Sequence, residues 1–261
     1  IKVYAFRYDL EDQTASLEIN TQNIRGGEGS GFFQQDFYLQ PKKGGLAETE
    51  LAVIFAQDVP PGAKKAYDDA VKSLDSKRET EGFDQLNDAI RQFPNYYLAL
   101  HRMGKELFLA KNYEKAIPFF YKAIEINPKS ATSFYYLGYS MHNLGKDFNK
   151  AATMSLEEAA ILAPASVQVL YLLGILQREG GDFKNAEKHL LQAKRFSKVA
   201  IPAIHKELAQ LYGNDMKKYK EAADELELYL NASKLSADEA KKTKKVIDEL
   251  RQKSKNRPSS E

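Results

Sequence analysis

Apolar and polar residues alternate with a period of two along the first part of the chain, and glycine-rich stretches interrupt the alternation. The pattern is clearest over residues 15–21 and 33–39, while residues 1–8 and 51–55 are rich in β-branched and aromatic side chains. Because successive side chains point to opposite faces of a strand, this alternation is typical of half-buried β-strands. We therefore expect about four short antiparallel strands in a β-rich segment over residues 1–59.

The pattern becomes helical near residue 60, where Pro60, Pro61 and Gly62 mark the change. A proline is tolerated in the first turn of a helix, so these residues predict the start of one. From Ala63 onward, alanines and large apolar residues recur three and four positions apart, which is typical of amphipathic helices. The fold class expected from the whole pattern is mainly α, with a small β segment in front.

Two kinds of landmark recur at a nearly constant spacing in the helical part. Glycines that follow a leucine or a methionine are 34 and then 36 residues apart, and three prolines show the same two intervals. An internal period of this size indicates a stack of similar helical units. The landmarks are Gly104, Gly138 and Gly174, and Pro94, Pro128 and Pro164.

The period and the residues at fixed positions resemble the tetratricopeptide repeat family, whose unit is two antiparallel helices. The second copy carries nearly the whole family pattern, in Leu100, Met103, Gly104, Leu107, Tyr113, Ala116, Phe120, Ala123 and Pro128. The third copy has two extra residues within residues 145–149, and the first and last copies are degenerate. The resemblance implies a right-handed α-solenoid of about five helix pairs over residues 62–233, a capping helix over residues 236–255 and a disordered tail over residues 256–261.

The β-rich segment has a resemblance of its own. It is interrupted by glycines, and it ends in an aromatic strand followed by a Pro-Lys step, over residues 37–43 (FYLQPKK). These features resemble part of a carboxypeptidase-regulatory-like β-sandwich of secreted and envelope proteins of bacteria. Such immunoglobulin- or transthyretin-like sandwiches have about seven strands, so an incomplete sandwich is expected. The resemblance implies an extracytoplasmic location, periplasmic, cell-surface or secreted, with the cytoplasm as the alternative. The start at Ile1 is typical of a processed product or a fragment.

Composition excludes several kinds of chemistry. The 261 residues include no cysteine, which excludes disulfides, thiolate metal sites and cysteine nucleophiles. The four histidines are never three or four residues apart and no catalytic motif is present, so we expect neither an enzyme nor a cofactor or metal. The net charge of +2 provides no general field for nucleic acid. No apolar run approaches the ~20 residues of a membrane span.

The first helix of each repeat carries residues outside the core, and the resemblance implies that they line the inner surface of the array. Several are aromatic with a polar edge, which suits a peptide or a partner helix because tyrosine offers a large contact area at low entropic cost. The alternative is that these rings pack on neighbouring helices. The candidate contacts are His101, Lys105, Phe108, Tyr135, Tyr139, His142, Tyr171, Ile175 and Arg178.

Some members of the family bind a C-terminal carboxylate with lysine and asparagine at set positions of this surface. That set is missing here, and the corresponding places are occupied by His101, Lys105, Tyr136, Gln168 and Leu172. Binding of a chaperone tail is therefore not expected.

Two further features lie near the C-terminus. A basic run over residues 241–257 is interrupted by acidic residues and has no aromatic residues between its charges, so it favours a solvated capping helix over a nucleic-acid or lipid site. Asn231, followed by Ala232 and Ser233, fits the N-glycosylation pattern and is a candidate glycan site.

Two functions fit these features. The first is a non-enzymatic protein–protein interaction scaffold of the bacterial cell envelope or exterior, which binds a protein or a peptide. The alternative is a self-assembling subunit of an extracellular filament, in which repeats stack and strands of the β-rich segment pair between protomers. In the alternative, the partner is a second copy of the chain.

Overall fold

The computed structural model describes residues 2–3, 13–14, 55 and 57–256 of the chain. The chain divides into two units, which cover Ile1–Ala56 and Gln57–Glu261. The second unit contains the helical repeats and all nine candidate contacts.

In the first unit, strands β1 (Lys2–Val3) and β2 (Gln13–Thr14) pair in the antiparallel direction. Lys2 lies opposite Thr14 and Val3 lies opposite Gln13. The other residues of the four predicted strands, except Phe55, lie outside the described residues. The β-rich segment and its likeness to a sandwich therefore stay predictions.

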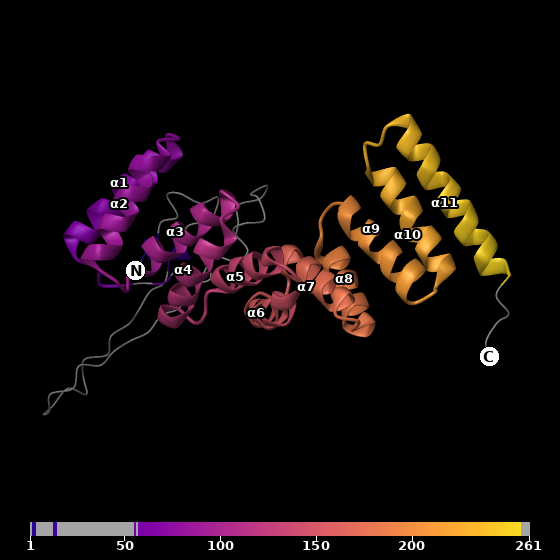
Figure 1. Ribbon diagram of the computed structural model, residues 1–261, viewed down its shortest axis with the longest axis horizontal. Helices are drawn as coiled ribbons and strands as arrows, with labels where there is room; N and C mark the ends of the chain where they lie inside the picture. The colour runs from indigo at the N-terminus through magenta and orange to yellow at the C-terminus, as the bar shows by residue number, and fades with distance from the viewer. Residues whose placement is uncertain (1, 4–12, 15–54, 56, 257–261) are drawn as a thin grey trace, which may run out of the picture. The chain divides into compact units, whose positions relative to one another are not determined.

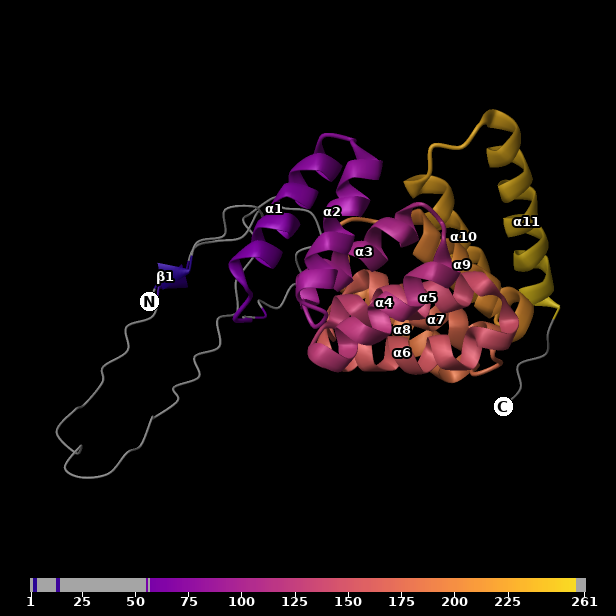
Figure 2. The same ribbon diagram turned by 60° about the vertical axis from the view of Figure 1, so that its left-hand side comes forward.

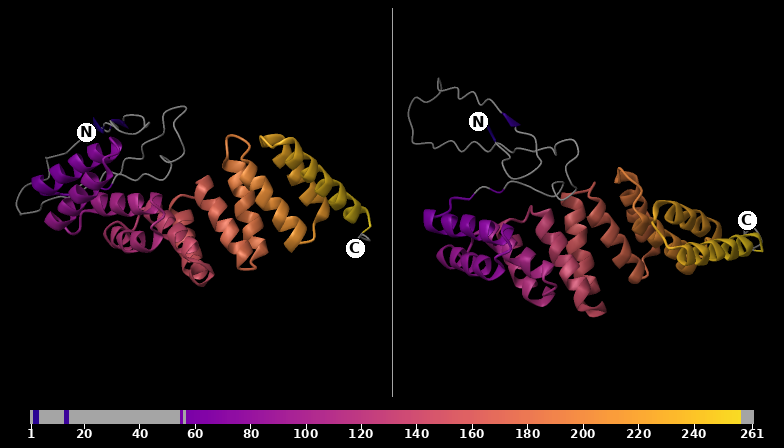
Figure 3. Two further views of the ribbon diagram at one scale, coloured as in Figure 1. Left: turned by 45° about the horizontal axis from the view of Figure 1, so that its top comes forward. Right: turned by 90° about the horizontal axis from the view of Figure 1, so that it is seen from above.

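Residues 57–256 contain eleven α-helices, a 3₁₀ turn η3 and a π-helical segment η4. Figures 1 and 2 show the helices following one another from α1 to α11, as does the view from above in Figure 3. The first ten helices pack as five successive pairs, and α11 packs against α10. The expected array of helix pairs is thus confirmed, while its right-handed sense stays a prediction. The elements are α1 (Pro61–Asp75), α2 (Glu79–Gln92), α3 (Tyr97–Leu109), α4 (Tyr113–Ile126), α5 (Ala131–Leu144), η3 (Lys146–Phe148), α6 (Asn149–Leu162), α7 (Val167–Glu179), α8 (Phe183–Phe196), α9 (Pro202–Gln210), η4 (Leu211–Asp215), α10 (Tyr219–Ala232) and α11 (Ala237–Lys255).

Local sequence signals determine where several helices begin. Helix α1 begins at Pro61, as the proline step predicts. At the start of α5, Ser130 Oγ accepts a hydrogen bond of 3.1 Å from the amide of Ser133. Helix α11 begins with a capping box, in which Ser236 and Glu239 each bind the other's backbone amide. Such caps satisfy amide groups that have no partner within the helix.

Small residues allow the two helices of a repeat to approach closely, as their recurrence predicts. In each of three repeats a methyl group added to the glycine would lie 2.7 or 2.8 Å from a large side chain of the second helix, closer than van der Waals contact permits. The spacing of the repeats therefore reflects a packing requirement that glycine meets. The pairs are Gly104 with Phe120, Gly138 with Leu156 and Gly174 with Leu190.

The buried side chains form three clusters that follow one another along the array. One cluster joins α1, α2 and α3, the next extends from α4 to α7, and the third extends from α7 to α10. Helix α7 contributes to two clusters, and Ile247 of α11 is also buried. No helix pair encloses a core alone, so stability comes from stacking of neighbouring repeats.

The extra residues of the third repeat lie in its turn between α5 and α6. Gly145 has a φ of 121° and is followed directly by η3. In the first and second repeats the corresponding turns contain Lys77 and Lys111 with φ near 60°, a left-handed conformation that side chains tolerate. The φ of Gly145 lies outside that region, so this longer turn requires glycine.

Candidate functional site

The nine candidate contacts lie on α3, α5 and α7, the first helices of three successive repeats, and we call this surface the first-helix face. All nine residues are partly buried. Lys105 and Ile175 are among them, on α3 and α7 respectively. The residues of the first-helix face therefore pack on neighbours and still expose part of their surface, and their contact with a partner stays a prediction.

Aromatic rings form a continuous cluster on α3 and α5. The ring centroids of Phe108 and Tyr139 are 5.1 Å apart, and those of Tyr135 and Tyr139 are 5.8 Å apart. Tyr136 is buried and stacks on Phe120 with a centroid distance of 5.5 Å. These contacts fix the ring positions before any partner arrives.

Tyr171 of α7 continues the aromatic surface into the next repeat. Burial raises the pKa of its hydroxyl, and the nearby Glu207 and Tyr139 contribute to the same direction. We refer to Tyr135, Tyr139 and Tyr171 as the tyrosine row.

His101 links α3 to α5. Its Nδ1 lies 2.9 Å from Ser133 Oγ, and its ring stacks on Tyr97 with a centroid distance of 5.8 Å. Burial, together with the positive charges of Lys105 and Arg102, lowers the pKa of His101 to about 4. The imidazole is therefore neutral at pH 7 and acts as a hydrogen-bonding link between helices, so it adds no positive charge to the first-helix face.

Two polar side chains of the first-helix face, those of Arg178 and His142, form hydrogen bonds with other helices of the array. Arg178 Nε donates to Glu207 Oε1 at 2.5 Å, and its Nη1 donates to Asp215 Oδ2 at 3.2 Å. His142 Nδ1 lies 3.2 Å from Asn149 Oδ1, and Asn149 Nδ2 donates to Glu179. Both side chains therefore connect neighbouring elements.

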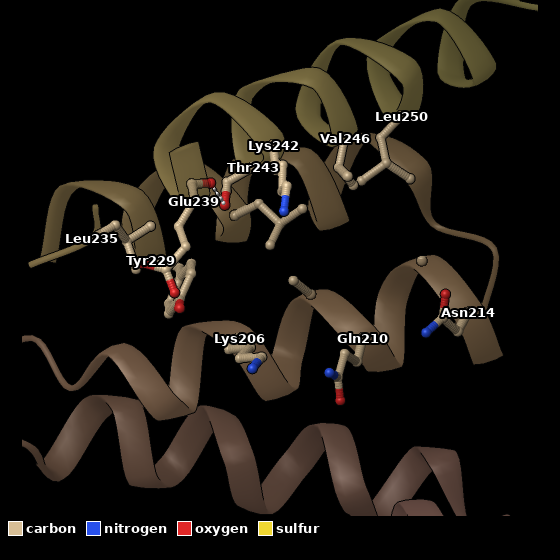
Figure 4. A pocket seen from close by; sticks show the side chains of 13 residues that line it. Lys206, Gln210, Asn214, Tyr229, Leu235, Glu239, Lys242, Thr243, Val246 and Leu250 are labelled. Carbon is tan, nitrogen blue, oxygen red and sulfur yellow. Dashed lines mark hydrogen bonds between the residues drawn. The ribbon is translucent and has the colours of Figure 1, made fainter. Parts of the chain in front are cut away.

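A cavity that sequence reasoning missed lies between α9, α10 and α11 (Figure 4). It has a volume of about 400 Å³. Helix α11, which the sequence predicts as a solvated capping helix, is mostly exposed and also forms one wall of this cavity. The small residues Ala209 and Gly213 opposite α11 are the signal that could have indicated the space. The lining residues are Lys206, Ala209, Gln210, Gly213, Asn214, Leu226, Tyr229, Leu235, Glu239, Lys242, Thr243, Val246 and Leu250.

The candidate glycan site lies in the last turn of α10. Asn231 is exposed there, while Ser233 Oγ is buried and has no hydrogen-bond partner among the described residues. Glycosylation at Asn231 stays a prediction.

Two searches of the described residues bear on other functions. No group of three or more histidine and acidic side chains in residues 57–256 is arranged to hold a metal ion. Across the part of the chain that the structure describes, no helix has the length and apolar character needed to cross a membrane.

Sequence comparison supports the repeat assignment. The sequence model of the tetratricopeptide repeat matches residues 97–130, which contain α3 and α4. The chain is 26% identical over 124 residues to the TPR repeat-containing protein MJ1428 of Methanocaldococcus jannaschii. That match covers 48% of this chain and 20% of the relative, so the chain spans about a fifth of the relative's length.

Three solved structures have a similar fold. A MamA fragment from residue 41 to its end, from Desulfovibrio magneticus RS-1, has a TM-score of 0.55 and 18% identity, covering 77% of this chain and 99% of the fragment. YrrB, a TPR protein with an unusual peptide-binding site, has a TM-score of 0.62 and 16% identity, covering 70% and 92%. PilW, a type IV pilus biogenesis factor, has a TM-score of 0.58 and 20% identity, covering 78% and 97%. The helix pairs of residues 57–256 therefore have the fold of tetratricopeptide-repeat arrays, and the sequence model of the repeat matches one of these pairs.

Proposed function

We propose that this chain is a non-enzymatic protein-interaction scaffold whose tyrosine row holds a peptide or a partner helix. The observation that carries the proposal is the placement of three partly exposed tyrosines on the first helices of two adjacent repeats. Tyrosine combines an apolar ring with a polar edge, which is the chemistry enriched at protein interfaces. YrrB, which shares the fold, has a peptide-binding site.

The packing of the tyrosine row favours binding. Tyr135 and Tyr139 pack against the cluster of α4–α7, and Tyr171 packs against the cluster of α7–α10. Side chains that are already held in one rotamer lose little entropy when a partner orders them. More of the contact energy is therefore available for affinity.

Conversion of Tyr135, Tyr139 and Tyr171 to phenylalanine together is expected to weaken partner binding about a hundredfold, because three hydrogen bonds of about 1 kcal/mol each are lost. Phenylalanine keeps the rings that pack on the core, so thermal stability should change little, whereas alanine would leave cavities. The measurement is a pull-down with the purified chain, followed by calorimetric titration of the captured partner.

Tyr121→Phe is the matched control, because Tyr121 lies on α4 outside the tyrosine row and is 48% exposed. It should bind the partner like the unmodified chain. Equal binding by the triple variant and the unmodified chain would contradict the proposal.

Self-assembly is a second proposal for this chain. Met154 and Ile161 lie seven residues apart on α6 and are 60% and 70% exposed, so their apolar side chains are accessible on one helix face. We expect native light scattering to give a mass that is a multiple of 29.5 kDa, falling to one copy in a Met154→Lys, Ile161→Lys variant. A monomer at high concentration would contradict this proposal.

Strand pairing between protomers and an extracytoplasmic location are proposals that rest on the sequence of the β-rich segment. Fractionation of cells that express the full natural gene, with detection of this chain in each fraction, tests the location. Recovery in the cytoplasmic fraction would count against it.

A further inference from the structure

We propose that the cavity between α9, α10 and α11 is a second binding pocket, which accepts a peptide segment with an acidic side chain next to aliphatic ones. This pocket is built from other helices than the tyrosine row, so it goes beyond the proposed function.

The pocket is elongated along two facing rows of residues. Lys206, Gln210 and Asn214 follow one another at intervals of four along α9 and η4, so they lie on one face one turn apart. Glu239, Lys242, Thr243, Val246 and Leu250 form the facing row on α11. The row on α9 and η4 is about 12 Å long, which matches about four residues of an extended peptide.

The apolar part of the pocket lacks a cover. Val246 of α11 is 44% exposed although it lines the cavity, and it is accompanied by Leu226, Tyr229 and Leu235 from α10 and the following loop. A volume of about 400 Å³ lies within the ~300–1,000 Å³ that is typical of ligand pockets. Aliphatic side chains of a partner would bury this surface.

The charges of the lining favour an acidic partner. Lys206 extends from α9 and Lys242 from α11, on opposite walls (Figure 4), and within residues 57–256 no salt bridge engages either lysine. Glu239 lies three residues before Lys242. Its Oε2 accepts hydrogen bonds from the amide and hydroxyl of Ser236 at 3.0 and 2.7 Å, which lower the pKa of this carboxyl, and the charge of Lys242 acts in the same direction. With two lysines and one glutamate, the lining keeps a net charge of +1.

The remaining polar groups of the pocket suit a peptide backbone. Thr243 Oγ1 donates to the carbonyl of Glu239 at 2.9 Å, the dashed line in Figure 4, so this hydroxyl is already used. The side-chain amides of Gln210 and Asn214 bond to no other residue among those described. Each amide offers both a donor and an acceptor, which an extended backbone needs. Helix α11 adds attraction at longer range, with seven basic residues against four acidic ones.

The test is a selection from a display library of short random peptides against the full chain. We expect the recovered peptides to be enriched in aspartate or glutamate next to leucine, isoleucine or valine. Their affinity should fall about tenfold or more in a Lys206→Glu, Lys242→Glu variant, because two attractive contacts become repulsive. It should also fall as salt rises. Val246→Asn, at an exposed position, should weaken the same peptides without unfolding the chain.

The control is a Lys241→Glu, Lys244→Glu variant, which makes the same charge change on exposed residues of α11 outside the lining. It should keep most of the affinity. Recovery of only neutral or basic peptides, recovery of none, or equal loss in both variants would overturn the proposal. The triple phenylalanine variant of the tyrosine row should bind the selected peptides normally, so failure of one site is distinguishable from failure of the other.

Discussion

Phe120→Ala is expected to lower the free energy of unfolding by about 3–5 kcal/mol. Phe120 is fully buried, its ring stacks on Tyr136 of the next repeat, and Gly104 of α3 faces the same ring. Alanine would therefore leave a cavity at the junction of two repeats. Since the surrounding helices relax only partly, both the lost burial and the cavity reduce stability.

Urea denaturation followed by circular dichroism measures this loss. Tyr121→Ala is the matched control, because it removes an aromatic ring from the next position of α4, where the side chain is 48% exposed. We expect the control to change the free energy of unfolding by less than about 1 kcal/mol. Similar losses for the two variants would show that the cluster at Phe120 is not the source of stability.

Gly138→Leu is expected to cost about 3 kcal/mol or more through overpacking. The first atom of any side chain at this position would lie 2.8 Å from Leu156 Cγ and 2.9 Å from the backbone carbonyl oxygen of Ala152. A leucine side chain has alternative rotamers, but a backbone carbonyl of α6 moves only with its helix. The two helices of the third repeat must therefore separate. Thermal denaturation of the purified variant measures the effect.

A matched pair of alanine substitutions isolates the cause. Gly138→Ala adds one methyl group at this close approach and is expected to destabilise the array by about 1–3 kcal/mol. Gly213→Ala adds the same methyl group where the nearest atom, Ala222 Cβ, lies at 3.4 Å, so it should be nearly neutral. A large loss at Gly213 with none at Gly138 would contradict the packing explanation.

The helix pairs of this fold could be predicted because the same packing contact requires the same type of residue in each repeat. Gly138 and Gly174 recur because each meets a leucine of its partner helix, and Pro61 marks a helix start through local chemistry alone. The family resemblance also predicted first-helix residues that line the inner surface, and in the structure these residues are partly buried. Each of these inferences depends on residues near one another in the chain or on the period itself.

The site could be predicted only in part, because its contacts join residues far apart in the sequence. The partners of Arg178 lie 29 and 37 residues further along the chain, so no local pattern indicates that its guanidinium is already bound. The cavity between α9, α10 and α11 depends on the distance between α11 and α9, and the hydrophobic pattern does not specify that distance. The sequence analysis therefore predicted a capping helix over residues 236–255 and no pocket beside it.

Arg178 links two successive repeats of the array through its ion pairs. Its ion pairs run from α7 to α9 and η4 without passing through α8, and the side chains of Arg178 and Glu207 are only 21% and 12% exposed. Any bending that moves α9 away from α7 must separate these charges in a weakly screened setting. Tyr171 lies two turns before Arg178 on the same helix face. Arg178 therefore ties the helix that carries Tyr171 to the next repeat, so we expect its removal to let α7 and α9 move apart more easily.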